Sequence, residues 1–148
     1  MFGIFTENKS FKSEFNETVL PASIIIGEFK EGMLIPVDYW SIKQYYASWL
    51  SSLKKGIYGK NNATLVVSMY SPKVANFLFS WVLYFRQENV IVQNKIIFLD
   101  EIKNFSIDKI NEYTSEYEAY SEGEKVSEWY TTIDEIKEFM IYLESKMT

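Results

Sequence analysis

The chain has 148 residues, of which 47% are hydrophobic and 18% aromatic, and its formal net charge is −5. This size suits a single domain, and the composition is too hydrophobic for a disordered chain. The sequence contains no cysteine and no histidine, which excludes disulfides, thiolate nucleophiles, a Ser-His-Asp triad and metal sites built on those two residues.

The N-terminal part of the sequence predicts a β-hairpin. Residues 1–20 have mixed charges and do not resemble a secretory signal, and we expect them to form an extra strand or a flexible arm. Residues 22–29 (ASIIIGEF) and 33–37 (MLIPV) are predicted to be strands joined by a turn at residues 30–32. Because Pro36 cannot donate a backbone hydrogen bond, its strand is expected to lie at a sheet edge or to end there.

A helix is predicted to follow this hairpin. Ser41 and Gln44 have the spacing of a capping box, in which each side chain bonds the backbone amide of the other residue. Hydrophobic residues then recur every three or four positions as far as Leu53, which is typical of a helix with one buried face. Tyr39 and Trp40 lie directly before the cap, where an apolar side chain packs back onto the first turns of a helix.

The second half of the sequence predicts more strands and a final helix. Residues 63–70, 76–87 and 90–100 are predicted to be strands, and the last two have a connection short enough for antiparallel pairing. Residues 76–87 (NFLFSWVLYFRQ) place hydrophobic side chains on both faces, which predicts a central strand covered on both sides. A long polar connection leads to a last strand at 125–131, and a second capping-box pattern at 132–135 begins the final helix.

Together these elements predict an α+β fold in which a single, mostly antiparallel sheet of about six strands packs against two main helices. No linker or internal repeat divides the sequence, so residues 1–148 are expected to form one domain. The longest hydrophobic run, residues 74–85, is shorter than the about 20 residues needed to span a bilayer, so no membrane partner is expected.

Negative charge is concentrated in residues 100–128, which contain nine acids and three bases, whereas the rest of the chain has a charge of +1. Such a field repels nucleic acid and attracts cationic partners. Within it, residues 117–132 (YEAYSEGEKVSEWYTT) interleave glutamates with tyrosines and a tryptophan. The stretch is either a docking surface for a basic protein or a hairpin whose aromatic residues face the core.

Strand alternation favours Trp129 in the core and Glu128 on the surface. The candidate partner-binding residues combine the acids of this region with its tyrosines. They are Glu112, Glu116, Tyr117, Glu118, Tyr120, Glu122, Glu124 and Glu128.

The sequence contains no catalytic motif, calcium loop or phosphate-binding loop, so no cofactor or metal is expected. The abundance of acids leaves two alternatives to a specific inhibitor open. One is a hydrolase that uses two carboxyl groups on a glycan, and the other is a generic adaptor for some other basic protein.

Four segments are informative together: SIIIGEFKE, VDYWSIKQY, ANFLFSWVLYFRQENVIVQNKIIFLDE and SEWYTTIDEIKEFM. They resemble one known family, the bacterial immunity proteins that protect cells from contact-dependent growth inhibition toxins. The resemblance covers residues 23–142. The N-terminal twenty residues lie outside the resemblance.

The resemblance implies a protein that stays in the cytoplasm of the producing cell and is not an enzyme. Its implied partner is the C-terminal domain of a cognate toxin, which in many members of the family is a basic nuclease. A nuclease needs a basic groove for its substrate. An acidic inhibitor can fill that groove by presenting carboxylates where phosphates would lie, and residues 100–128 supply such acids.

Overall fold

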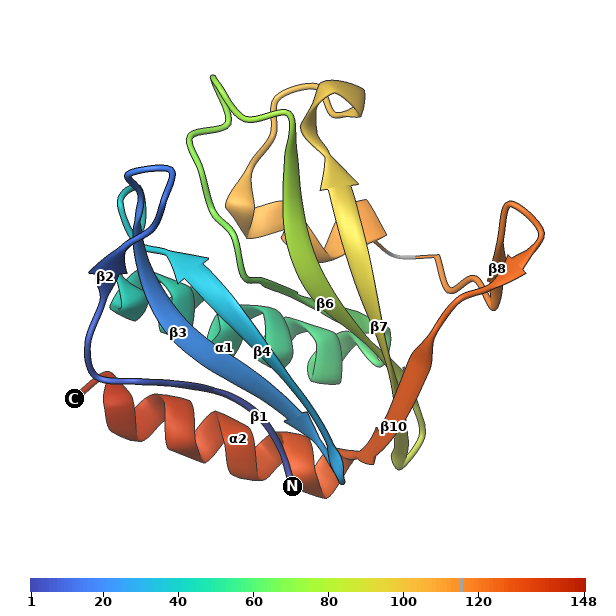
Figure 1. Ribbon diagram of the computed structural model, residues 1–148. Coiled ribbons are helices and arrows are strands. Elements are labelled where there is room, and N and C mark those ends of the chain that lie inside the picture. Colours follow the sequence, from blue (N-terminus) through green and yellow to red (C-terminus); the bar gives the residue numbers. More distant parts are fainter. Residues whose placement is uncertain (115) are drawn as a thin grey trace.

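The computed structural model describes residues 1–114 and 116–148, which form antiparallel sheets, two α-helices and two 3₁₀ helices (Figure 1). The elements of the first half are β1 (Phe2–Thr6), β2 (Phe11–Lys12), β3 (Thr18–Ile26), β4 (Phe29–Pro36) and α1 (Ile42–Gly59). Those of the second half are β5 (Asn62–Val66), β6 (Phe77–Arg86), β7 (Asn89–Phe98), η1 (Leu99–Glu101), η2 (Ile107–Thr114), β8 (Tyr120–Ser121), β9 (Glu124–Lys125), β10 (Glu128–Thr132) and α2 (Ile133–Lys146).

The first sheet, sheet A, is built around β3. Ile26 pairs with Phe2 of β1 and with Phe29 of β4, so β1 and β4 lie on opposite edges of β3. Val19 pairs with Pro36 of β4 and, on its other side, with β2. The short strand β2 therefore shares the edge that β1 occupies. The edge position expected for the strand of Pro36 is confirmed.

The second sheet, sheet B, has the strand order β10-β7-β6-β5, and β8 and β9 form a separate two-stranded hairpin. The prediction of an α+β fold with mostly antiparallel strands is confirmed, but the prediction of a single six-stranded sheet is wrong. Each long hairpin pairs with different neighbouring strands. The β3–β4 hairpin pairs with β1 and β2, and the β6–β7 hairpin pairs with β5 and β10. The two sheets then meet through side chains, where Trp129 of β10 lies between Phe29 of sheet A and Trp81 of sheet B.

The turn between β3 and β4 lies at Gly27 and Glu28, before the predicted turn residues, because Ile26 pairs directly with Phe29. Gly27 has a φ of 62°, in the left-handed region that glycine enters without a steric penalty. The hairpin turns at this first glycine, and the second, Gly32, lies inside β4. The hairpin is therefore confirmed, and the position of its turn is corrected.

Helix α1 begins as the sequence predicts. The Ser41 hydroxyl accepts a hydrogen bond from the Gln44 amide at 3.3 Å, and the Gln44 side-chain oxygen accepts one from the Ser41 amide at 2.8 Å. Trp40 packs edge-on against Tyr45 with ring centroids 5.2 Å apart, which is the contact expected of the residue before the cap. Tyr39 remains 49% exposed and takes no part in the core.

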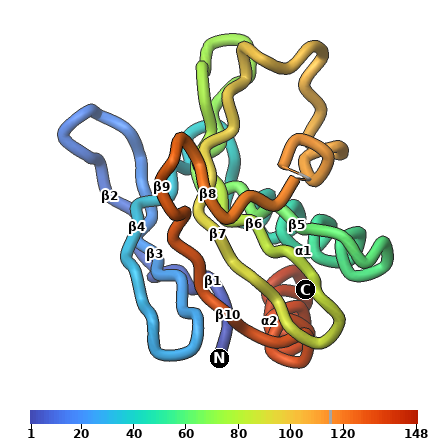
Figure 2. Tube along the Cα trace, turned by 90° about the vertical axis from the view of Figure 1, so that its right-hand side faces the viewer, coloured from blue at the N-terminus to red at the C-terminus, as the bar shows by residue number. Residues whose placement is uncertain are grey.

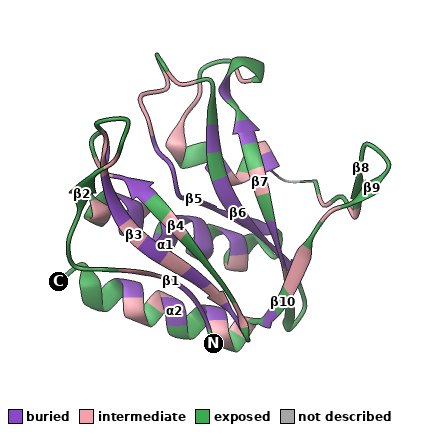
Figure 3. Ribbon diagram, viewed as in Figure 1, coloured by how far each residue is buried: buried purple, intermediate pink, exposed green. Residues whose placement is uncertain are grey.

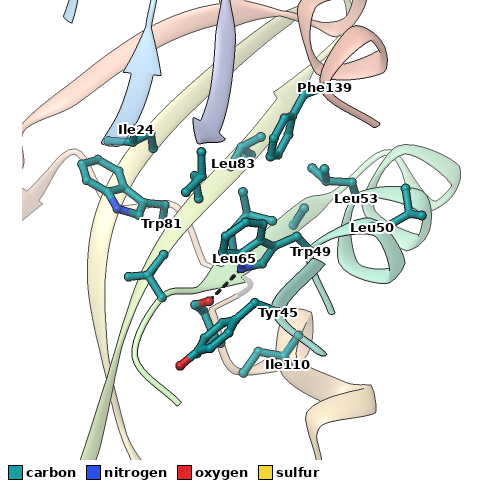
Figure 4. Packing of buried hydrophobic residues seen from close by; sticks show 14 of the residues in the cluster. Ile24, Tyr45, Trp49, Leu50, Leu53, Leu65, Trp81, Leu83, Ile110 and Phe139 are labelled. Carbon is teal, nitrogen blue, oxygen red and sulfur yellow. Dashed lines mark hydrogen bonds between the residues drawn. The ribbon is translucent and has the colours of Figure 1, made fainter. Parts of the chain in front are cut away.

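The aromatic face of α1 lies between the two sheets and joins them (Figure 4). The Tyr45 hydroxyl donates to the Pro36 carbonyl of sheet A at 2.6 Å and accepts from the Met69 amide at 2.8 Å. The Trp49 indole nitrogen donates to the Val66 carbonyl of sheet B at 2.7 Å. Both rings are fully buried, and each polar atom has a partner, so their burial costs no unpaired polar group.

Helix α2 packs against β1 and α1 through Phe139, whose ring lies edge-on to Phe2 at 5.6 Å. Its cap forms only half of the predicted box: the Thr132 hydroxyl accepts from the Glu135 amide at 3.3 Å. The Glu135 carboxylate instead accepts from the N-terminal amine at 2.8 Å and from the Thr131 hydroxyl. This carboxylate therefore ties the start of the chain to α2 and stabilises the position of β1.

Strand β6 is covered on both faces for only part of its length (Figure 3). Trp81 on one face and Val82 and Tyr84 on the other are buried, as predicted. Phe77 and Phe79 are exposed at the start of the strand, so the prediction of cover on both sides is wrong there. The face that carries Trp81 is called the inner face of sheet B below, and the face that carries Tyr84 is its outer face.

Gly56 lies where α1 approaches sheet B closely. A methyl group at this position would lie 2.6 Å from the Asn62 carbonyl oxygen and 2.8 Å from the Phe85 ring, whereas one at Gly59 would meet nothing within 4 Å. We expect Gly56→Ala to lower the free energy of unfolding by about 1–3 kcal/mol, as overpacking does. Gly59→Ala in the same helix should leave it unchanged or raise it by up to about 1 kcal/mol. Urea denaturation measures both, and equal effects would contradict the packing argument.

Candidate functional site

The connection from β7 to β10 carries most of the candidate residues, and its first part is fixed to the β5 edge of sheet B. The Asn62 side-chain nitrogen donates to the Asn111 carbonyl at 2.8 Å, and the Asn111 side-chain oxygen accepts from the Thr64 amide at 2.8 Å. The Asn111 side-chain nitrogen reaches the Ser52 carbonyl of α1 at 3.0 Å. These bonds dock η2 onto β5 and α1, with Glu112 exposed on it.

The chain then crosses the outer face of sheet B, and residues 116–119 are called the crossing segment. The Tyr84 hydroxyl of β6 and the Lys95 ammonium of β7 both donate to the Glu116 carbonyl at 3.0 Å. The Gln93 side-chain nitrogen donates to the Glu118 carbonyl, also at 3.0 Å. The sheet thus holds this segment by its main-chain carbonyls. The side chains of Glu116 and Glu118 remain exposed to solvent.

One carboxylate joins the crossing segment to β10. Glu128 accepts hydrogen bonds from the Tyr117 hydroxyl at 2.6 Å, the Tyr130 hydroxyl at 2.5 Å and the Gln93 side chain at 3.3 Å. Partial burial opposes ionisation, but the three hydrogen bonds outweigh it and lower the pKa of Glu128. The hydrogen bond to this carboxylate raises the pKa of Tyr117 to about 12. An ionised Glu128 therefore organises the network.

The bases on this face contact rings and carbonyls. The Arg86 guanidinium lies 5.4 Å from the Tyr117 ring centroid, and the Lys95 ammonium lies 5.2 Å from that of Tyr84. Burial lowers the pKa of Lys95, and the nearby Glu118 and Glu116 oppose the shift.

Ion pairs in the described chain lie elsewhere: the N-terminal amine pairs with Glu135, and Lys54 pairs with Glu144. Neither pair includes an acid of residues 100–128. Within the described chain, the negative charge of this region is therefore not offset by direct ion pairing.

The hairpin of β8 and β9 projects from the body of the molecule (Figure 1), and Figure 2 views the molecule from the side on which this hairpin lies. Glu122 and Gly123 form its turn, with φ values of 51° and 85°. Tyr120 is 63% exposed, and the side chains of Glu122 and Glu124 face solvent. The hairpin therefore displays its acids and one tyrosine without supporting the core.

The structure places the eight candidate residues along one path, from Glu112 at the β5 edge, over the outer face of sheet B, to the hairpin and Glu128 at the β10 edge. Six of them are exposed, whereas Tyr117 and Glu128 are half-buried and bonded to each other. Trp129 points the other way and packs against the core, as expected, whereas Glu128 is half-buried and not on the surface as predicted. In the described parts of the chain, no group of three or more acids is placed to hold a metal ion.

Four further exposed residues were not among the candidates. Phe77, Phe79, Ile96 and Phe98 lie on the inner face of sheet B, each between 41% and 49% exposed. The sequence predicts Phe77 and Phe79 to be buried, because alternation along a strand shows which residues share a face but not how far that face is covered.

Comparison with known proteins places this chain in a family. A family model described as the CdiI N-terminal domain matches residues 35–139. The chain belongs to the CdiI family. The resemblance to immunity proteins of contact-dependent growth inhibition is therefore confirmed.

The relatives of this CdiI-family protein cover almost its whole length. A protein of Enterobacter cloacae subsp. cloacae, named Immunity protein CdiI, is 43% identical over 140 residues, which is 94% of this chain and 96% of the relative. A chain of the CdiA-CT/CdiI toxin and immunity complex from Enterobacter cloacae superposes with a TM-score of 0.93 at 42% identity, covering 98% of this chain and 99% of that chain. Among the residues described here, no helix combines the length and hydrophobicity that crossing a bilayer requires.

Glu128→Gln is expected to destabilise the protein near neutral pH, where the wild-type carboxylate is ionised and accepts three hydrogen bonds. Because folding lowers the pKa of Glu128, its stabilising contribution is present above the ordinary glutamate pKa and is lost as the pH falls through the lower, folded value. The difference in unfolding free energy between the two proteins should therefore shrink below about pH 4.

Urea titrations at a series of pH values measure this difference. Glu116→Gln is the matched control, because its side chain is exposed and only its backbone carbonyl is held by the sheet. A difference for Glu128→Gln that does not change with pH would contradict the network.

Proposed function

We propose that this CdiI-family protein is an immunity protein that binds the C-terminal domain of a cognate contact-dependent growth inhibition toxin in the cytoplasm and occludes its active site. The observation that carries the proposal is the path of exposed acids over the outer face of sheet B. Family membership supports the immunity function, and the matching solved structure is a toxin and immunity complex from Enterobacter cloacae.

The charge supports a basic partner, and we infer that the toxin domain is a nuclease. A nuclease surrounds its substrate phosphates with lysine and arginine, so its active site attracts carboxylates at the same positions. Glu112, Glu116, Glu118, Glu122 and Glu124 face solvent and are free to occupy such positions. Charge of this kind raises the association rate constant, up to about 10⁸–10⁹ M⁻¹s⁻¹ at low salt.

The two half-buried candidates have a positioning role in this proposal. Tyr117 and Glu128 hold the crossing segment against sheet B, so they position the exposed acids. Tyr120 on the hairpin is exposed and supplies an aromatic contact to the partner.

Binding explains these carboxylates better than glycan hydrolysis does. A retaining or inverting hydrolase needs two carboxyl groups about 5–10 Å apart in a cleft, with one free to act on a bound sugar. Both oxygens of Glu128, the most enclosed of the candidate acids, already accept hydrogen bonds from the protein. We therefore propose a stoichiometric inhibitor whose acids contact a protein, and family membership favours a toxin over an unrelated adaptor partner.

Charge reversal at four exposed acids tests the proposed surface. Glu116, Glu118, Glu122 and Glu124 are changed together to lysine, and binding to the toxin domain encoded by the neighbouring reading frame is followed by stopped-flow kinetics and calorimetry. We expect the association rate constant to fall at least about tenfold and its dependence on salt to flatten, because the steering field is lost.

The matched control reverses four exposed acids elsewhere, Glu7, Glu14, Glu28 and Glu138. It changes the net charge equally but leaves the acidic path intact, so it should retain most of the association rate. Unchanged affinity in the first variant, or equal losses in both, would show that the proposed surface is not the one that meets the toxin.

A further inference from the structure

The inner face of sheet B ends in a hydrophobic patch. It consists of the four exposed residues that were not among the predicted candidates. Phe77 pairs with Phe98 and Phe79 pairs with Ile96, so all four side chains lie on the same face of two adjacent strands. Their exposed fractions are 45%, 41%, 45% and 49% in chain order. The rings of Phe77 and Phe79 pack edge-on at 5.4 Å, which makes the patch continuous. We call these four residues the apolar end face.

This face continues the hydrophobic core beyond the point where the core is covered. The next inner-face residue of β6, Trp81, is only 2% exposed, and the Trp129 ring lies 5.6 Å from it. Asn94, the partner of Trp81 in the register, is exposed and marks the boundary. Toward this end of β6 and β7, exposed residues interrupt the buried ones along both strands (Figure 3).

The opposite face at the same end of the sheet is buried. Leu78 and Ile97 are paired across β6 and β7, and they are 0% and 3% exposed. The exposure of the inner face is therefore not a general fraying of the strand ends. A contiguous apolar patch of this kind on an otherwise well-packed domain marks a site of protein–protein contact.

We propose that the apolar end face is the hydrophobic centre of the interface with the toxin domain, an inference that rests on the proposed function. Aromatic residues are enriched at the centres of protein interfaces, and their burial there slows dissociation. The apolar end face and the crossing segment lie on opposite faces of sheet B. In the described chain β10 pairs only with residues 89–93 of β7. A toxin domain that reaches round the edge of β7 beyond Gln93 therefore contacts the acids on one face and the apolar end face on the other.

Two acids near the end of β7 fit a basic partner. Asp100 and Glu101 lie two and three residues after Phe98 and are both exposed. Lys95, which adjoins Ile96 in the chain, points to the outer face, where its ammonium contacts the Glu116 carbonyl.

A second copy of the chain fits less well. A two-fold contact through this patch would bring Asp100 and Glu101 of both copies around the same small area, where like charges repel. Four half-exposed side chains also fall short of the about 800 Å² that each partner contributes to a standard interface. A toxin domain that also contacts the acidic rim extends the buried area with complementary charge.

The test replaces Phe79 and Ile96 by threonine, which keeps the strand propensity and removes the hydrophobic surface. Binding of the toxin domain encoded by the neighbouring reading frame is followed by surface plasmon resonance at several salt concentrations. We expect the dissociation rate constant of the double variant to rise about 30-fold or more, the loss typical of an interface hot spot. The association rate constant and its salt dependence should stay close to those of the wild type.

Leu34→Thr is the matched control, because Leu34 is 52% exposed on a strand of sheet A and points away from the core. The Leu34→Thr protein should dissociate from the toxin domain at the wild-type rate. Thermal unfolding of each variant confirms that it is folded before its kinetics are compared.

The outcomes separate the inference from the proposed function. If the double variant dissociates at the wild-type rate while reversal of the acids slows association, the inference is overturned and the proposed function stands. If the wild type does not bind the toxin domain at all, the proposed function fails. Sedimentation that shows a wild-type dimer and a monomeric double variant, with unchanged toxin kinetics, would assign the patch to self-association and overturn the inference.

Discussion

The fold depends on one buried aromatic helix face. Sheets A and B are separate ladders in the described chain, so the hydrogen bonds of their strands cannot hold them together. Helix α1 does so through Tyr45, which bonds the end of β4, and Trp49, which bonds the end of β5. Because both rings place a large apolar surface and a satisfied polar tip between the sheets, they fix position as well as supplying hydrophobic stabilisation. Gly56 allows the same helix to approach β5 closely.

Local elements could be predicted from the sequence because their signals are local. The capping box at Ser41, the helical repeat up to Leu53 and the β3–β4 hairpin each depend on residues close in the chain. The division into two sheets depends on distant partners, such as Phe2 with Ile26 and Glu128 with Gln93. A hydrophobic period of two identifies the faces of a strand but not its neighbouring strands. The sequence therefore could not distinguish a fold with two sheets from a fold with one.

The candidate site was predictable in charge but not in geometry. The excess of acids in residues 100–128 is a property of composition, and the structure leaves most of those side chains in solvent. The pairing of Tyr117 with Glu128 requires the chain to cross sheet B first, and only the structure shows that crossing. The exposure of Phe77 and Phe79 could not be predicted from the sequence either. They carry the pattern of core residues, and that pattern does not show how far neighbouring elements cover the face.

The way in which sheet B holds the crossing segment separates its stability from its recognition. Tyr84, Lys95 and Gln93 donate to main-chain carbonyls, which every residue type possesses, so the side chains at positions 116 and 118 do not contribute to these bonds. Replacing those side chains changes the electrostatic potential while the segment stays attached. Residues of the apolar end face lack this freedom, because they lie within the ladder of β6 and β7 and continue the core. A fold arranged in this way allows partner selection by charge to change independently of the surface that we propose holds the partner.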